Sequence, residues 1–285
     1  MREGEGSRTA ERVAARRAVH QILDDPVVFA DPLAWAVLRP AAAQRLREDP
    51  RQLDRSPAGR FLRAFLAARS RLAEDRLRDA VARGVRQYVV VGAGLDTFAY
   101  RNPHADAGLR VFEVDHPATQ AVKRARLADA GVSVPESVAF VPADLASVPL
   151  GAALRGTGFD PSTPSFFSWL GVVPYLERQA IRATLESVAS LPAEATLVFD
   201  YGAPPPWYRW LTRLALRRMG ERVAAAGEPW KTFFRPAELL RELHGAGFRS
   251  VEDLGPGELN RRYFAGRRDG LRVGGVGHVV VAANR

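Results

Sequence analysis

The spacing of apolar and polar residues changes its period near residue 84. Upstream of this point, apolar residues recur at helical spacing, and three helices are expected: Thr9 to Leu23, Ala34 to Arg47 and Pro57 to Arg83. Downstream, short apolar runs at about 86–91, 110–114, 138–141, 165–169 and 195–200 alternate with helical patterns near 95–101, 117–130 and 177–190. This alternation predicts an α/β fold, with a mostly parallel sheet covered by helices on both faces.

The same pattern predicts the organisation of the chain. Residues 1–85 form an N-terminal helical extension, and residues 86–285 form the sheet domain, which ends in an antiparallel edge strand over Gly277 to Ala282. Residues 202–245 interrupt the alternation with a stretch rich in proline and tryptophan and an amphipathic pattern from Leu211 to Met219. We expect this insertion to form a helical lid.

Two glycines and three acids mark a ligand site. Gly92 and Gly94 follow the first apolar run directly, which allows a tight turn and a close approach of the backbone to a ligand. Asp115 ends the second run 21 positions after Gly94 (115 − 94 = 21), close to the spacing of about 20 expected for a ribose-binding acid. Asp96 and Asp144 end neighbouring units. The carboxyl ends of parallel strands meet at one edge, so the three acids are expected there together, with helix capping as the alternative for each.

The residues around the turn favour one nucleotide over another. Thr97 stands where a dinucleotide fingerprint has its third glycine. Three carboxylates would also repel a pyrophosphate, whereas they attract a sulfonium, an ammonium group and ribose hydroxyls. We therefore predict S-adenosyl-L-methionine as the cofactor, with S-adenosyl-L-homocysteine as product, and disfavour a nicotinamide dinucleotide.

The chain resembles the leucine carboxyl methyltransferase-like family, in a branch of actinobacterial type whose substrates are unassigned. The resemblance rests on residues 84–101, which include Gly-Ala-Gly-Leu-Asp-Thr, and on residues 112–117, 144–145, 227–234 and 262–271. It implies a Rossmann-like class I methyltransferase fold with a seven-stranded sheet.

The resemblance also implies roles for individual residues. Gly92 and Gly94 face the methionine part of the cofactor, Asp115 holds the ribose hydroxyls, and Asp144 and Leu145 frame the adenine. Two further residues complete the predicted cofactor set with Asp96: Arg69, which pairs with the cofactor carboxylate, and Ser168, which lies near the end of the fourth apolar run. Leu170 stands where many relatives have a glutamate, so any role of that glutamate has no counterpart at this position.

Composition narrows the classes of partner. The net charge is +9, but there are only two lysines, and the arginines are spread over every segment. Arginine pairs such as Arg16-Arg17 lack the tight interleaving with aromatic residues of a strand-binding groove, so a nucleic-acid partner is not expected. The chain has no cysteine, no H-x-x-x-H motif and no apolar run of about 20 residues, and its first 20 residues are charged. We expect no metal, no membrane partner and a cytoplasmic location.

Methyl transfer requires alignment of the acceptor and exclusion of water more than it requires catalytic side chains. A carboxylate acceptor needs no base at pH 7, whereas a hydroxyl acceptor does. The candidates for contact with the acceptor are Tyr175 and Tyr201, past the ends of the fourth and fifth apolar runs, and His116, next to Asp115. Aromatic residues of the lid region favour an apolar or aromatic small molecule: Trp207, Tyr208, Trp210, Trp230, Phe233 and Phe234.

These observations predict an S-adenosylmethionine-dependent O-methyltransferase that acts on a carboxyl or hydroxyl group of a small molecule, in secondary metabolism. Two alternatives stay open. One is methylation of a protein C-terminal carboxylate, and the other is a methyltransferase fold that uses the bound cofactor for a non-methylating reaction such as cyclisation.

Overall fold

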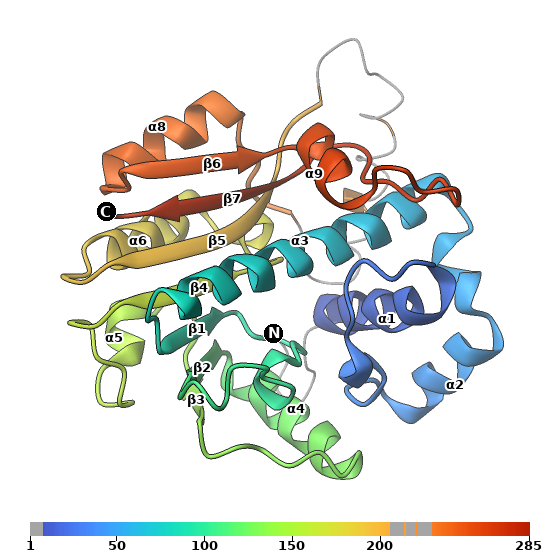
Figure 1. Ribbon diagram of the computed structural model, residues 1–285, viewed down its shortest axis with the longest axis horizontal. Helices are drawn as coiled ribbons and strands as arrows, with labels where there is room; N and C mark the ends of the chain where they lie inside the picture. The colour runs from blue at the N-terminus through green and yellow to red at the C-terminus, as the bar shows by residue number, and fades with distance from the viewer. Residues whose placement is uncertain (1–7, 206–213, 215–219, 222–229) are drawn as a thin grey trace.

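The computed structural model describes residues 8–205, 214, 220–221 and 230–285. Its strands form one seven-stranded sheet in the order β3-β2-β1-β4-β5-β7-β6, in which β7 runs antiparallel to both neighbours (Figure 1). The strands are β1 Gln87–Val91, β2 Arg110–Asp115, β3 Val138–Pro142, β4 Ser165–Trp169, β5 Ala195–Gly202, β6 Ser250–Leu254 and β7 Gly277–Ala283. This architecture confirms the predicted α/β class and the Rossmann-like sheet.

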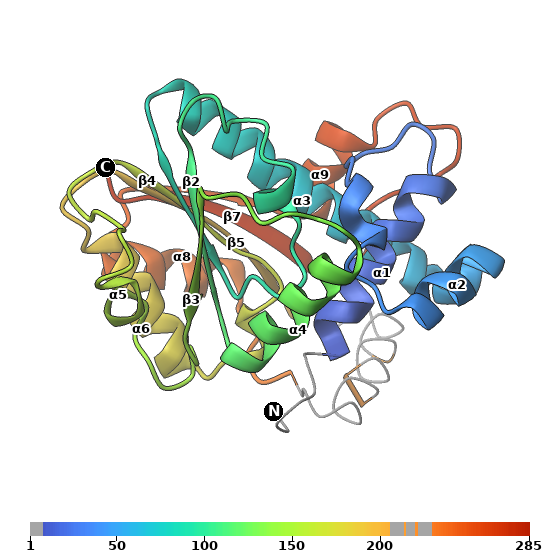
Figure 2. The same ribbon diagram turned by 90° about the horizontal axis from the view of Figure 1, so that it is seen from below.

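Helices cover both faces of the sheet. The described helices are α1 Arg8–Leu23, α2 Pro40–Glu48, α3 Pro57–Ala82, α4 Pro117–Asp129, α5 Leu150–Leu154, α6 Arg178–Ala189, α8 Pro236–Ala246 and α9 Pro256–Tyr263. Helices α3 and α9 lie on one face and α5, α6 and α8 on the other, while α1 and α2 lie beside the sheet (Figures 1 and 2). Short 3-10 turns complete the element list: η1 Pro32–Trp35, η2 Pro50–Asp54, η3 Phe98–Tyr100 and η4 Val173–Tyr175.

Strand β1 shows why the central strands read as continuous apolar runs. All five of its residues are buried. Tyr88 and Val90 pack in the core beneath α3, and Val89 and Val91 pack in the core beneath α5, α6 and α8. Successive side chains of a strand point to opposite faces, so a strand covered on both sides is apolar along most of its length. The buried amide of Gln87, at the start of β1, forms hydrogen bonds with Asp160 and Thr163.

Helix α3 belongs to the core of the sheet. Leu72 and Leu77 of α3 are fully buried in the same cluster as Tyr88 and Val90 of β1. The expected boundary near residue 85 therefore does not divide the chain into two cores. Helices α1 and α2 form a smaller cluster of their own, which also includes Leu95 of the glycine turn.

Two predicted helices differ from the structure. The helix expected near 95–101 is only the single turn η3, because Asp96 and Thr97 use their side chains in tertiary and local hydrogen bonds. The helix expected from Ala34 to Arg47 is interrupted before Pro40, whose ring disfavours helical backbone at Arg39 and leaves that residue extended.

The insertion predicted over 202–245 is shorter than expected at its C-terminal end. Helix α8 packs against α6 as part of the helical layer, and Phe234 is fully buried in the core on that face. The predicted lid helix from Leu211 to Met219 lies outside the described residues apart from Leu214, as do Trp207, Tyr208 and Trp210. The hydrophobic pattern of the sequence did not predict β6, α5 or α9.

The shared core of α3 and the sheet leads to a stability prediction. Leu72→Ala is expected to lower the free energy of unfolding by about 2–5 kcal/mol in a single cooperative denaturant transition, because it leaves a cavity against the sheet. Ile22→Ala, at a side chain that is 54% exposed, serves as control and should change it by less than about 0.5 kcal/mol. A separate early transition that alone responds to Leu72→Ala would contradict the shared core.

Candidate active site

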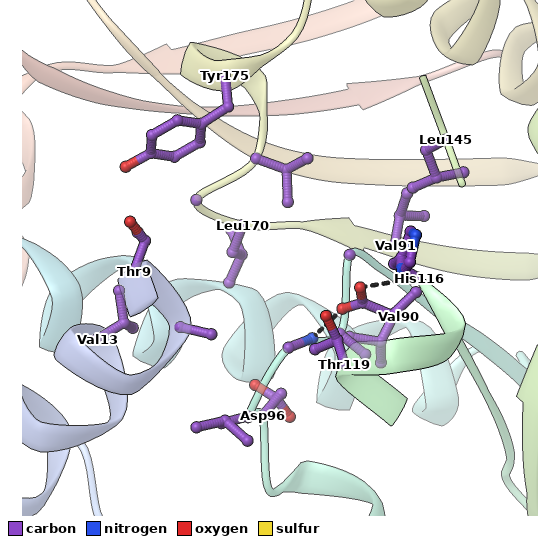
Figure 3. Close-up of a pocket in the computed structure, with 18 of the residues that line it drawn as sticks. Thr9, Val13, Val90, Val91, Asp96, His116, Thr119, Leu145, Leu170 and Tyr175 are labelled. Atoms are coloured by element: carbon purple, nitrogen blue, oxygen red, sulfur yellow. Dashed lines mark hydrogen bonds between the residues drawn. The ribbon is translucent and has the colours of Figure 1, made fainter. Parts of the chain in front are cut away.

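A cavity of about 280 Å³ lies at the carboxyl ends of β1 and β4. The strand order reverses between these two neighbours, and such a point is where open α/β sheets bind ligands. The walls come from five parts of the chain: α1, α3, the turn after β1, the ends of β2 and β3 with the residues that follow them, and the segment from β4 to η4 (Figure 3).

The glycine turn after β1 forms the floor of the cavity. Gly92 and Gly94 have positive φ angles of 66° and 48°, which glycine adopts without strain. The N–H groups of Gly92 and Ala93 donate to the carbonyl of Val114 at 2.8 and 3.1 Å, which fixes the turn to β2. A Cβ atom at position 92 would overlap the side chain of Val172, so glycine is required for this close approach.

Asp115 ends β2 beside this turn and lines the cavity. One carboxylate oxygen accepts from the N–H of His116 at 2.6 Å, and the other accepts from the N–H of Gly94 (Figure 3). Burial raises the pKa of Asp115 above its usual value, although both N–H donors act in the opposite direction. A carboxylate held in this way next to an open cavity suits a pair of ribose hydroxyls.

Asp144, Leu145 and His116 lie near one end of the cavity, and Figure 3 shows Leu145 and His116 far from Tyr175. Asp144 accepts from the N–H of Ala146 at 3.0 Å. The His116 ring is the N-cap of α4, because its Nδ1 accepts from the N–H of Ala118 at 3.2 Å. The structure therefore groups these three predicted residues, and it places His116 away from the opposite end, where Tyr175 lies.

Asp96 also lines the cavity but is tied to the surrounding protein. Its carboxylate accepts from the N–H of Phe98 at 2.8 Å and lies 3.5 Å from Nη1 of Arg17. Burial by itself would raise its pKa, but the charges of Arg17, Lys123 and Arg101 hold the pKa of Asp96 below its ordinary value. The nearby cations therefore keep the Asp96 carboxylate ionised.

Arg17 connects α1 to the glycine turn. Its guanidinium donates to the carbonyl of Leu95 at 2.5 Å and lies 3.1 Å from the Asp31 carboxylate. Thr97 donates to Asp31 at 2.6 Å, and Arg101 pairs with Glu74 of α3. Asp96, Thr97 and Arg101, which follow the glycine turn, thus hold α1 and α3 around it. Neither Arg17 nor Asp31 was among the site residues predicted from the sequence.

Arg69 projects from α3 into the opposite wall of the cavity. Its Nη1 lies 2.7 Å from the Asp200 carboxylate at the end of β5, and both side chains are nearly fully buried. Asp200 also accepts from the N–H of Gly171 at 2.5 Å, so one carboxylate orients both Arg69 and the turn after β4. Ser168, which lines the cavity as well, forms a 2.7 Å hydrogen bond with the hydroxyl of Tyr88.

The end of the cavity near Tyr175 is largely apolar. Leu170, Val172 and Leu176 line it from the segment after β4, and Thr9 and Val13 line it from α1. Figure 3 shows the Tyr175 and Thr9 side chains directed toward each other across this end. Trp230 donates from Nε1 to the Tyr175 hydroxyl at 3.3 Å.

Tyr201 does not line the cavity, which corrects its predicted contact with the acceptor. The ring is 2% exposed and packs against Phe234, and its hydroxyl donates to Asp253 at 2.8 Å. Side chains alternate along β5, so Asp200 points to the Arg69 side and Tyr201 points to the core beneath α6 and α8.

The described residues contain no group of histidine, aspartate and glutamate side chains arranged to hold a metal ion. Within the same ranges, every helix is too short or too polar to cross a bilayer.

The strand order, the glycine turn and the acid on the next strand define a class I S-adenosyl-L-methionine-dependent methyltransferase. Residues 10–189 match the family model for leucine carboxyl methyltransferase, which is more than half of the 285 residues. The chain therefore belongs to the leucine carboxyl methyltransferase family, which confirms the predicted family, fold and cofactor.

Individual relatives agree with this assignment. The chain is 32% identical over 305 aligned residues to YktD of Bacillus subtilis, named as an S-adenosyl-L-methionine-dependent methyltransferase, with all of both chains covered. A methyltransferase of the same description from Mycolicibacterium gilvum is 37% identical over 66% of this chain and 64% of its own. Two solved structures share the fold with a TM-score of 0.59. One is a DUF574 protein of Streptomyces avermitilis (19% identical, 99% of each chain), and the other is a methyltransferase of Thermobifida fusca (17%, covering 95% and 93%).

The hydrogen bonds of Asp115 lead to a prediction for both ligand binding and stability. Asp115→Asn should weaken S-adenosylhomocysteine binding about tenfold or more in calorimetric titration, because a charge-assisted bond to the ribose is lost. Each oxygen of Asp115 accepts from a backbone N–H group, and an asparagine can accept through only one atom, so the same variant should also unfold at a lower temperature without ligand. Asp106→Asn, at an exposed acid, should change neither quantity. Unchanged affinity in folded Asp115→Asn would remove Asp115 from the site.

The close contact between Gly171 and Arg69 leads to a prediction about cofactor binding. Its φ is 75°, and a Cβ atom there would lie 2.9 Å from Nη2 of Arg69. Gly171→Ala should displace the guanidinium and weaken S-adenosylmethionine binding at least fivefold, as should Asp200→Asn. Gly266→Ala, at a positive-φ glycine with open space around it, controls for backbone strain alone. Equal losses in Gly171→Ala and the control would mean that Arg69 contributes nothing to cofactor binding.

Proposed function

We propose that this protein transfers the methyl group of S-adenosyl-L-methionine to an oxygen of a small, largely apolar molecule, and that this oxygen belongs to a carboxylate. The observation that carries the proposal is the chemistry of the cavity near Tyr175. Its described lining residues are Thr9, Val13, Arg69, Ser70, Leu170, Val172, Tyr175 and Leu176. Among them there is no histidine, lysine or acid to act as a base.

The residues of the cavity fit the cofactor. When bound, S-adenosyl-L-methionine supplies a methyl group on a positively charged sulfur. Asp115 is positioned to accept from the ribose hydroxyls, and Asp144 and Leu145 to border the adenine. Arg69 offers a guanidinium to the carboxylate of the methionine part, at the side of the cavity opposite Asp115. The glycine turn leaves room for the chain between these two anchors.

The absence of a base within this described lining favours a carboxylate over a hydroxyl as the acceptor. A carboxylic acid has a pKa near 4 and is ionised at neutral pH, so it needs only orientation. An alcohol or phenol, with a pKa near 10 or above, would require a base in hydrogen-bond reach. Tyr175 and Thr9 offer hydroxyl groups that can orient an oxygen, and neither is a base at neutral pH. The apolar side chains exclude water from the same region.

A small acceptor suits a cavity of about 280 Å³ better than a folded protein does. Methylation of a protein C-terminal carboxylate shares the same chemistry, so the test includes a peptide acceptor. His116 has no part in the proposed transfer, because its ring caps α4 near Leu145.

The proposal predicts a pH profile and a product. The protein is incubated with S-adenosylmethionine and matched pairs of aryl and alkyl carboxylic acids and the corresponding alcohols and phenols, together with a short peptide. Formation of S-adenosylhomocysteine and of base-labile methyl esters is measured by mass spectrometry. Acids should be methylated with a kcat that is flat between about pH 6 and 8, since no base titrates in that range. Tyr175→Phe should lower kcat/KM by less than about tenfold.

Two outcomes would contradict the proposal. Preferential methylation of phenols or alcohols, with a rate that rises with pH through a single ionisation, would require a base and exclude a carboxylate acceptor. Tight binding of S-adenosylmethionine with formation of other products and no S-adenosylhomocysteine would favour a non-methylating reaction.

A further inference from the structure

Tyr88 of β1 has a buried hydroxyl group that reaches Ser168, near the end of β4. Its ring packs edge-on against Phe98 and Phe166 in the core beneath α3, with ring centroids 5.0 and 5.7 Å away. The hydroxyl lies 2.7 Å from Oγ of Ser168, and among the described residues it has no other hydrogen-bond partner. Burial raises the pKa of Tyr88 well above its usual value, so the phenol keeps its proton and that proton needs an acceptor.

The direction of this hydrogen bond follows from the partners that each hydroxyl can reach. If Ser168 were the donor, the Tyr88 proton would stay in the core without an acceptor, which costs folding free energy. Tyr88 is therefore the donor, and Ser168 keeps its own proton for a different partner. The described residues provide no second partner for the Ser168 hydroxyl. An oxygen of a bound molecule is the acceptor that this proton lacks.

Ser168 lines the cavity on the same side as Arg69. The serine is only 2% exposed, and Arg69 also lines the cavity. In the sheet, Ser168 is in register with Val198, and Asp200 lies two residues further along β5 on the same face. Asp200 holds Nη1 of Arg69 at 2.7 Å. The Ser168 hydroxyl and the Arg69 guanidinium are therefore both at the carboxyl ends of β4 and β5, on the face that α3 covers.

We propose that Tyr88 is a positioning residue: it donates to Ser168 and thereby directs the Ser168 hydroxyl, as a donor, to the cofactor carboxylate that Arg69 binds. A guanidinium and a hydroxyl donor suit a carboxylate, which accepts through two oxygens. Hydrogen bonds in a chain polarise one another, so donation by Tyr88 also strengthens donation by Ser168. The inference rests on the proposed function, because it takes Arg69 as the partner of the same carboxylate.

The experiment compares the wild type with Tyr88→Phe, Ser168→Ala and the double variant. Each protein is titrated calorimetrically with S-adenosylhomocysteine and with decarboxylated S-adenosylhomocysteine, which lacks only the amino-acid carboxylate. Thermal unfolding is recorded without ligand. Tyr201→Phe is the matched control, because it removes the hydroxyl of another buried tyrosine, one that bonds Asp253 outside the cavity.

Three results are expected together. Ser168→Ala should bind S-adenosylhomocysteine about tenfold more weakly and bind the decarboxylated analogue as the wild type does. Tyr88→Phe should weaken S-adenosylhomocysteine binding about threefold, and it should add nothing in the Ser168→Ala background, because it acts through Ser168. Without ligand, Ser168→Ala should melt about 3 °C below the wild type, since it strands the Tyr88 proton, and adding Tyr88→Phe should recover part of that loss. Tyr201→Phe should keep the wild-type affinity for both ligands.

Other results would overturn this role. Equal losses for both ligands in Ser168→Ala would show that the hydroxyl does not serve the carboxylate. Unchanged affinity for S-adenosylhomocysteine with a raised KM for a carboxylic acid acceptor would assign the hydroxyl to the acceptor instead. A further loss from Tyr88→Phe in the Ser168→Ala background would make Tyr88 a packing residue only. In these three cases the wild type still binds S-adenosylhomocysteine and the proposed methyl transfer stands, whereas a wild type that does not bind it would contradict both.

Discussion

The buried guanidinium of Arg17 is the interaction on which the site depends. It bonds the carbonyl of Leu95 and faces the carboxylates of Asp31 and Asp96, so it joins the first helix to the turn that follows the first strand. Asp96 and Asp31 would be costly to bury as isolated charges, and Arg17 would be equally costly without them. This mutual requirement holds α1 against the turn. As a result Thr9, Ala10 and Val13 become walls of the cavity.

The cavity separates charge along its length. Asp115 and Asp144 lie toward the Leu145 end, and each is held by backbone N–H donors. Arg69 lies on the opposite wall, where Asp200 behind it balances its charge. The rest of the lining is mostly apolar, with Asp96 and Ser168 among its polar residues. A ligand with hydroxyl groups at one end and a carboxylate at the other meets complementary partners at both ends without a reorganisation of the protein. A displacement reaction requires such fixed alignment of the reacting groups.

The sequence predicts most of the sheet and part of the site, for different physical reasons. Strands β1, β2, β4 and β5 are continuous apolar runs because both their faces are buried, so their positions follow from composition alone. Strand β6 at the edge contains Glu252 and Asp253 in largely exposed positions and has no such run. Gly92, Gly94, Asp115 and Asp144 could be placed together because the carboxyl ends of parallel strands share an edge.

The remaining site residues depend on information that local patterns do not contain. The pairing of Arg69 with Asp200 joins positions 131 residues apart. Tyr201 was assigned to the site and Asp200 was not, although they are neighbours, because the choice between them depends on which face of β5 each residue occupies. Packing determines which face of β5 each residue occupies: Val198 lies beneath α3, and Phe199 lies on the opposite face. A period-2 pattern shows that side chains alternate, but it cannot show which set faces the ligand when both faces are apolar.

Leu170 links the electrostatics of the cavity to the choice of acceptor. Position 170 lines the acceptor end, where the family resemblance implies a glutamate. A carboxylate there would compete with Asp200 for Arg69, and it would repel an anionic acceptor while serving a neutral one as a base. With leucine at this position, Arg69 keeps a single buried partner and the described acceptor lining has no negative charge. Leucine at position 170 is therefore consistent with the proposed carboxylate acceptor.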